Sequence, residues 1–136
     1  MTAIQTIVET GIYADDLQAA EQFYHAVLGL PVVTREAGRS VFFQVGSSSM
    51  LLVFDPSATI QSDHMASHGA RGPGHFALGI PAGSLAEWRG RLAAHGVPIE
   101  QEKRWPRGGQ SLYFRDPAGN LVELLTPGLW GLPAGW

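Results

Sequence analysis

The chain reads Met50-Leu51-Leu52-Val53-Phe54-Asp55-Pro56 near its middle and Leu121-Val122-Glu123-Leu124-Leu125-Thr126-Pro127 near its end. Each stretch follows a similar segment, Ser40-Val41-Phe42-Phe43 in the first case and Ser111-Leu112-Tyr113-Phe114 in the second. Short runs rich in β-formers and bounded by turn residues predict strands. The chain therefore contains an internal duplication, and a cleft between two matched halves would receive side chains from equivalent positions of each half.

Each half is expected to form a strand, a helix and three further strands. The first half predicts a strand over 7–13, a helix over 17–28 with Asp15-Asp16 as its N-cap pair and Gly29 at its end, and strands near 31–36, 40–45 and 49–54. The second half predicts a strand over 75–80, a helix opened by the capping-box spacing of 84–87, with Leu85, Trp88, Leu92 and Ala93 as its buried stripe, and strands near 98–103, 110–115 and 121–126.

The predicted fold class is α+β. Two tandem βαβββ modules are expected to pair into a curved mixed sheet around a metal and substrate cleft. The whole chain, 1–136, is interpreted as one domain. Its expected parts are module one (about 5–56), a polar linker and candidate lid (57–72), module two (about 73–127) and an apolar C-terminal tail (128–136).

Composition excludes several classes of function. The chain has 9 Lys and Arg against 12 Asp and Glu, a net charge of −3, which argues against a nucleic-acid surface. No apolar run approaches the length of a membrane span, and the first residues carry no basic signal segment. There is no cysteine for a disulfide or a thiolate. A cytoplasmic protein without membrane or nucleic-acid partners is the resulting expectation.

Overlaying the halves selects four equivalent positions: Glu9, Leu52, His75 and Glu123. Three of these four side chains can bind a metal. An acid such as Glu123 within an apolar run is costly unless it is paired, bound to a metal or facing a wet cleft.

The chain also resembles the vicinal oxygen chelate superfamily, which includes glyoxalase I, extradiol dioxygenases, fosfomycin-resistance proteins and bleomycin-resistance proteins. The resemblance spans about residues 5–127. It is carried by three signatures: Glu9-Thr10-Gly11-Ile12-Tyr13 with the following helix, Gly74-His75-Phe76-Ala77-Leu78, and the segment from Tyr113 through Asp116-Pro117-Ala118-Gly119-Asn120 to Leu124.

The resemblance implies a metal site made of Glu9, His75 and Glu123. Glu9 stands where the family usually has His, and Leu52 stands where glyoxalase I has a fourth ligand. One imidazole and two carboxylates suit one divalent ion of Fe, Mn, Ni, Co, Zn or Mg, and the residues do not choose among these metals. Three protein ligands leave coordination positions open to substrate.

Several residues are candidates for contact with substrate. The predicted substrate-binding residues are Leu52, Phe54, Arg104, Ser111 and Tyr113. Tyr113, Arg107 and His68 are candidates for a catalytic role, although a core aromatic, an exposed arginine and a solvated loop histidine are the competing structural interpretations. Ser111 and Tyr113 resemble residues that line the cavity of fosfomycin-resistance proteins.

Two functions remain open. The first is a metal-dependent enzyme, a lyase or dioxygenase in preference to an isomerase or transferase, acting on a small molecule whose vicinal oxygens chelate the metal. The alternative is a metal-free drug- or metabolite-binding protein of the bleomycin-resistance type. The resemblance and the apolar tail imply a homodimer. The sequence leaves open whether modules pair within a chain or swap between chains.

Overall fold

The computed structural model describes residues 2–133 and 135–136. Met1 and Ala134, which belong to the predicted domain and tail, lie outside the described residues. The chain divides into two compact units, and the boundary falls between Gly72 and Pro73. The segment predicted as a linker, 57–72, therefore groups with the first unit.

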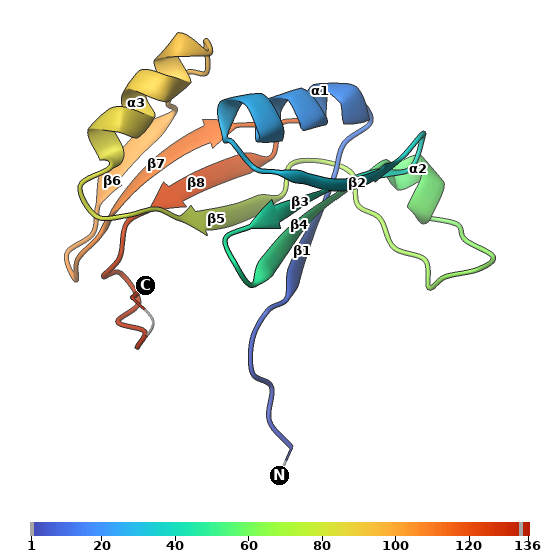
Figure 1. The fold of residues 1–136 in the computed structure, drawn as a ribbon, viewed down its shortest axis with the longest axis horizontal. Coiled ribbons are helices and arrows are strands. Elements are labelled where there is room, and N and C mark those ends of the chain that lie inside the picture. Colours follow the sequence, from blue (N-terminus) through green and yellow to red (C-terminus); the bar gives the residue numbers. More distant parts are fainter. Residues whose placement is uncertain (1, 134) are drawn as a thin grey trace. The chain divides into compact units, whose positions relative to one another are not determined.

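The first unit is built around a four-stranded sheet in the order β1-β4-β3-β2. Figure 1 shows its elements in blue and green. They are β1 (Glu9–Tyr13), α1 (Leu17–Glu21), the π-helix η1 (Gln22–Val27), β2 (Val32–Glu36), β3 (Ser40–Val45), β4 (Ser49–Phe54) and α2 (Pro56–Thr59). Strand β1 pairs with β4 in parallel, whereas the other two pairs are antiparallel.

The second unit repeats this plan with the sheet order β5-β8-β7-β6 (Figure 1). Its elements are β5 (His75–Gly79), α3 (Leu85–Ala94), β6 (Gln101–Arg104), β7 (Gln110–Arg115) and β8 (Leu121–Leu125). Here β5 and β8 form the parallel pair. The prediction of an α+β fold made of two tandem βαβββ modules is confirmed.

Each sheet buries one face beneath its own helix. In the first unit the rings of Tyr24 on η1 and Phe43 on β3 lie 5.6 Å apart, and both residues are fully buried. In the second unit Phe114 and Val122 are fully buried at paired positions of β7 and β8. Burial of such a side chain stabilises the fold by about 1.5–3 kcal/mol. The opposite face of each sheet is left to carry the candidate site residues.

The first predicted helix begins and ends where expected but changes type halfway. Asp16 caps it by accepting a hydrogen bond from the Ala19 amide at 3.0 Å, and Gly29 follows it with a φ of 75°. Between these ends the backbone widens into η1, where the Leu28 amide donates to the Phe23 carbonyl five residues earlier. The periodicity predicts one continuous helix because a π-turn leaves almost the same apolar spacing.

The predicted capping box at the start of α3 does not form. Ser84 makes no side-chain capping bond, and its hydroxyl donates instead to the Pro81 carbonyl at 2.7 Å. Of the predicted stripe, Leu85 and Leu92 are buried, whereas Trp88 is half-buried and Ala93 is exposed. Serine competes for nearby carbonyls in this way, so the spacing alone does not decide its partner.

The polar connection after β4 starts with a short helix. Asp55 accepts a hydrogen bond from the Ser57 amide at 2.9 Å and caps α2, in which Pro56 occupies the first turn. Residues 60–74 then run without helix or strand. The His68 amide donates to the Thr59 carbonyl at 3.0 Å, which ties the far part of this segment back to α2.

Candidate functional site

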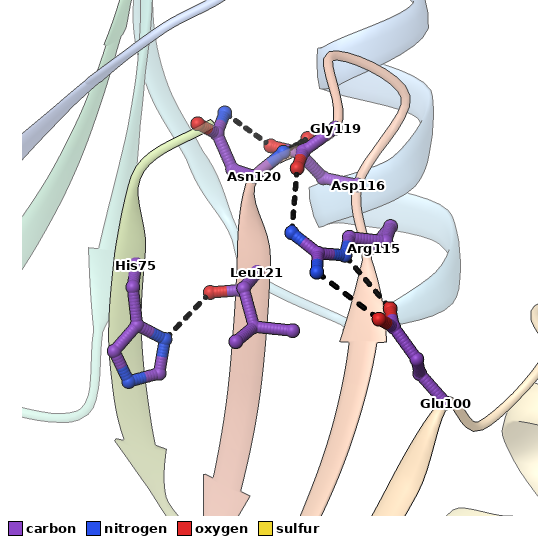
Figure 2. A network of polar contacts seen from close by, with 7 residues as sticks. All are labelled: His75, Glu100, Arg115, Asp116, Gly119, Asn120 and Leu121. Carbon is purple, nitrogen blue, oxygen red and sulfur yellow. Dashed lines mark hydrogen bonds and ion pairs between the residues drawn. The ribbon is translucent and has the colours of Figure 1, made fainter. Parts of the chain in front are cut away.

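The turn between β7 and β8 fixes the start of β5. The Asp116 carboxylate accepts hydrogen bonds from the Ala118 and Asn120 amides at 3.0 and 2.8 Å, and the Asn120 side chain donates to its other oxygen at 2.9 Å. Figure 2 shows this contact between Asn120 and Asp116. The Asn120 side-chain oxygen also accepts from the Gly74 amide at 2.8 Å. Gly119 closes the turn with a φ of 89°. The turn therefore holds the residue that precedes His75.

An exposed ion pair also contacts this turn. Arg115 donates two hydrogen bonds to the Glu100 carboxylate, at 2.7 and 3.1 Å, and a third to the Gly119 carbonyl at 3.2 Å (Figure 2). The hydrogen bond from Arg115 holds the pKa of Glu100 below its ordinary value. Both side chains are exposed to solvent, so the pair orients the turn more than it stabilises the fold.

His75 is held at one ring nitrogen and presents the other to Glu123. Its Nδ1 atom lies 3.0 Å from the Leu121 carbonyl oxygen (Figure 2). A carbonyl can only accept, so Nδ1 carries a proton. The Nε2 atom lies 3.4 Å from Oε1 of Glu123. Nε2 therefore either carries a second proton and forms an ion pair, or offers its lone pair to a cation shared with the carboxylate.

Glu123 is a buried carboxylate, only 6% exposed, whose second oxygen is already engaged. The Ser111 hydroxyl donates to Oε2 at 2.5 Å, and Trp105 Nε1 donates to the Ser111 oxygen at 2.8 Å. The Lys103 ammonium lies 5.4 Å from the centre of the Trp105 ring. This chain of donors satisfies one side of the carboxylate and leaves Oε1 directed at His75.

Tyr113 shares this face of the second sheet. It is the strand partner of Glu123 on β7, and its ring centre lies 6.3 Å from that of His75. Burial raises the pKa of Tyr113 above its ordinary value; the Ser111 hydrogen bond partly opposes this shift, and the charge of Glu123 adds to it. A phenol that stays protonated can donate a hydrogen bond to a ligand on this face.

The first unit holds a separate cleft of about 570 Å³ over its own sheet. Glu9, Leu52, Phe54 and His68 are among the residues that line it. His68 Nδ1 lies 2.8 Å from the Tyr13 hydroxyl, and its ring meets the Phe54 ring edge-on at 4.6 Å between centres. Three of these lining residues, Leu52, Phe54 and His68, are sequence candidates for substrate contact or catalysis.

Strand register makes the two units directly comparable. Glu9 and His75 are the first residues of β1 and β5, and each lies two residues before the partner of Leu52 or Glu123, respectively. Phe42 pairs with Leu52 just as Tyr113 pairs with Glu123. The four positions selected by the sequence overlay are therefore equivalent in the structure.

The candidate metal ligands are not all gathered. Glu9 belongs to the first unit and His75 with Glu123 to the second. Within residues 2–133 and 135–136, no group of three or more His, Asp or Glu side chains is assembled to hold a metal ion. The pair of His75 and Glu123 is the part of the predicted set that the structure brings together.

Arg104, the arginine predicted to bind substrate, lies on the opposite face of the second sheet from Ser111. Register pairs Arg104 with Gln110 and its neighbour Lys103 with Ser111. Adjacent side chains on a strand point to opposite faces, so Lys103 shares the Ser111 face and Arg104 points to the other one. Arg107 is exposed in the turn that joins β6 to β7.

Two residues of the site lack an assigned role in the sequence prediction. Trp105 is not among the predicted site residues, yet its ring nitrogen donates a hydrogen bond to Ser111. Asn120 appears only within the third signature, yet its side chain accepts a hydrogen bond from the Gly74 amide. Asp116 and Asn120 are buried polar residues in a tight turn. Buried polar groups require partners, so a polar side chain in this turn indicates a structural hydrogen bond.

A family model matches residues 6–124. It describes the Glyoxalase/Bleomycin resistance protein/Dioxygenase superfamily. The chain belongs to this superfamily. No helix in the described part of this superfamily member has the length and apolar character of a membrane span.

Solved structures of other proteins share this fold. A lactoylglutathione lyase from Agrobacterium tumefaciens is 43% identical, with a TM-score of 0.90, and the match covers 96% of this superfamily member and 100% of that chain. A superfamily protein from Sphaerobacter thermophilus is 22% identical, with a TM-score of 0.69 and coverage of 90% and 98%. The oxidase ChaP-H2 is 24% identical, also with a TM-score of 0.69, and coverage is 96% and 98%. No curated protein matches the chain.

Proposed function

We propose that the chain is a metal-dependent enzyme that acts on a small molecule with two adjacent oxygen atoms. His75 and Glu123 bind one divalent ion, and Glu9 supplies a third ligand. Superfamily members commonly use a divalent metal, which supports this assignment. Ligand positions left open by three protein groups receive the substrate.

The observation that carries the proposal is the His75–Glu123 pair. With Nδ1 protonated by its bond to the Leu121 carbonyl, an Nε2 atom without a proton directs its lone pair at a carboxylate oxygen 3.4 Å away. Two such atoms repel each other unless a proton or a cation lies between them. Ligands about 2.1 Å from one ion lie roughly 3.0–3.4 Å apart, so the pair fits a shared divalent ion.

A bound divalent metal polarises substrate oxygens and stabilises a developing oxyanion. The protein residues prepare that site. Ser111 and Trp105 hold the Glu123 carboxylate in one orientation, as outer hydrogen bonds do for metal ligands. Tyr113 donates a hydrogen bond to the substrate from the same face.

A glyoxalase-type lyase is the specific reaction to test first. The 43% identity to a lactoylglutathione lyase supports it. Leu52 counts against it, because glyoxalase I is expected to have a fourth ligand there and leucine cannot bind a metal. Lactoylglutathione should therefore be assayed beside small diols, hydroxy-ketones and catechols.

A metal-free binding protein is the second candidate. The cleft of the first unit has the volume of a small-molecule site and an apolar floor, both of which favour binding. Stoichiometric ligand binding without turnover, unchanged by a chelator, would support this function and contradict the enzyme.

We also infer a homodimer, as superfamily proteins are commonly dimeric. Glu9 then comes either from the same chain as His75 or from a second copy. Mixing Glu9→Ala protein with Glu123→Ala protein separates these cases. A swapped site regains metal binding in the mixture, whereas a site within one chain does not. The cytoplasmic location stays a prediction.

Metal content tests the main proposal. The protein is purified without a chelating resin, and the wild type is compared with Glu123→Ala and with Glu87→Ala, which removes an exposed carboxylate on α3. The expected result is one divalent ion per chain in the wild type and the control, and none in Glu123→Ala. Absence of metal in all three, with no thermal shift on adding Mn²⁺, Fe²⁺, Ni²⁺ or Zn²⁺, would overturn it.

A further inference from the structure

We propose that the cleft of the first unit is a binding site for an uncharged aromatic ring that carries a hydroxyl group, and that His68 binds this hydroxyl. The inference rests on the proposed function, because Glu9, the proposed third metal ligand, lines the same cleft. It adds the chemical class of the ligand and a role for segment 57–72 of the first unit.

The floor of the cleft is apolar and aromatic. Phe42, Leu52 and Phe54 point to one face of neighbouring strands, and the rings of Phe42 and Phe54 meet edge-on at 5.3 Å between centres. Aromatic rings gain most from edge-on or offset contacts, which a further planar ring can make here. The Met65 side chain lines the cleft as well, and a thioether also packs well on rings.

His68 is held at one side of this floor. Tyr13 lies beside Phe54 on the next strand, and its hydroxyl is 2.8 Å from His68 Nδ1. The ring also meets the Phe54 ring edge-on, and the backbone bond to Thr59 holds the main chain at His68. A segment without regular structure thus places one imidazole over the sheet.

The hydrogen bond to Tyr13 determines what His68 can offer. Because Nδ1 is taken, Nε2 is the ring nitrogen that remains for a ligand. Nε2 donates if Tyr13 donates to Nδ1, and accepts in the other tautomer. A hydroxyl group both donates and accepts, so it satisfies His68 in either tautomer.

The charges of the lining favour an uncharged ligand. The two carboxylates, Glu9 and Glu36, match the two guanidinium groups, Arg35 and Arg39. Arg35 donates two hydrogen bonds to Glu21, and Arg39 donates one to the Ala58 carbonyl while lying 3.7 Å from Glu36. An anionic ligand would therefore have to compete with existing partners of both arginines.

Naphthol binding to chelator-treated protein tests the inference. The fluorescence of naphthol should change saturably as the protein is added. Naphthalene, which lacks the hydroxyl, should bind about three- to tenfold more weakly. Naphthoate, which is charged, should also bind more weakly. Saturable binding of naphthol that is no tighter than that of naphthalene and naphthoate would overturn the proposed class of ligand.

Three variants locate the site. His68→Ala should weaken naphthol binding about tenfold, and Leu52→Trp should weaken it at least as much by filling the floor. His64→Ala removes an exposed histidine of the same segment that does not line the cleft, and it should leave binding unchanged. Equal affinity in all of these proteins, or no binding at all, would overturn the site. Circular dichroism confirms that each variant is folded.

Measuring both metal uptake and naphthol binding separates this inference from the proposed function. Naphthol binding with no metal uptake by the wild type contradicts the enzyme and supports the ligand site. Metal uptake that depends on Glu123, without naphthol binding, supports the metal site and overturns the inference about His68.

Discussion

Leu52 and Glu123 occupy the same register position in the two sheets. Leu52 pairs with Gly11 and Phe42, and Glu123 pairs with Ala77 and Tyr113. Both side chains are more than nine-tenths buried. The duplication therefore places an apolar side chain in one unit where the other unit has a carboxylate held by Ser111.

Replacing Leu52 by Glu should make the first unit resemble the second. The variant should be less stable without metal by about 2–4 kcal/mol, because it loses a buried apolar side chain and buries a carboxylate. Added Mn²⁺ or Ni²⁺ should raise its Tm more than that of the wild type, since Glu9 stands at the position of His75. Leu52→Gln is the control of equal size. An equal response to metal in both variants would show that the new carboxylate does not bind.

Removing the Ser111 hydroxyl should loosen Glu123. Ser111→Ala leaves the Trp105 ring nitrogen and one carboxylate oxygen without their partner, which should cost about 1–3 kcal/mol. Metal affinity should fall about 10- to 100-fold, as for other outer-shell residues. Ser40→Ala, at the equivalent position beside Leu52, is the control and should leave metal affinity unchanged. A Trp105 fluorescence spectrum identical to that of the wild type would contradict the hydrogen-bonded chain from Trp105 through Ser111 to Glu123.

Truncating Asn120 should release the start of β5. Asn120→Ala removes the acceptor of the Gly74 amide and the donor to Asp116, at an expected cost of about 2–3 kcal/mol. Metal affinity should fall too, because His75 follows Gly74 directly. Glu100→Gln acts on the same turn only from its exposed side, and it should change Tm little. Wild-type hydrogen exchange at Gly74 in Asn120→Ala would contradict this role.

Most of the fold could be predicted from the sequence, because each strand buries one face in alternation. The strands 40–45, 49–54 and 110–115 are found with the predicted bounds. The strand predicted near 98–103 lies instead at Gln101–Arg104. Pro98 lacks an amide hydrogen, which weakens pairing at its beginning.

The site could be predicted only in part. The duplication identifies His75 and Glu123 because their residue types are unusual at those positions. It cannot reveal that Trp105 reaches Ser111, since this contact depends on how the turn after β6 bends. Similarly, the face of Arg104 depends on the exact register of β6, which a shift of one residue would reverse.

Gly79 should be intolerant of any side chain because the C-terminal ring covers it. A Cβ atom at Gly79 would overlap the Trp136 ring, which is anchored by a hydrogen bond from its Nε1 atom to the Leu125 carbonyl at 2.9 Å. Gly79→Ala should therefore displace Trp136, shift its fluorescence toward that of an exposed indole and expose the tail to proteolysis. Gly90→Ala on α3 meets no neighbouring atom and should be neutral or stabilising. Deleting Trp136 should abolish the effect of Gly79→Ala, and persistence of that effect would contradict the contact.

Tyr113 should keep its phenolic proton beyond its ordinary pKa as the solution becomes alkaline. Its pKa is raised above 10.0 chiefly by burial, so the folded protein keeps this proton at pH values where the unfolded chain loses it. The stabilisation is fully present below pH 10.0 and is lost as the pH rises through the raised value. An ultraviolet titration of the phenolate measures the shift, and Tyr113→Phe should remove the late phase and flatten the fall of Tm above pH 10.0. A Tyr113 that ionises at its ordinary pKa would mean that this face is open to water.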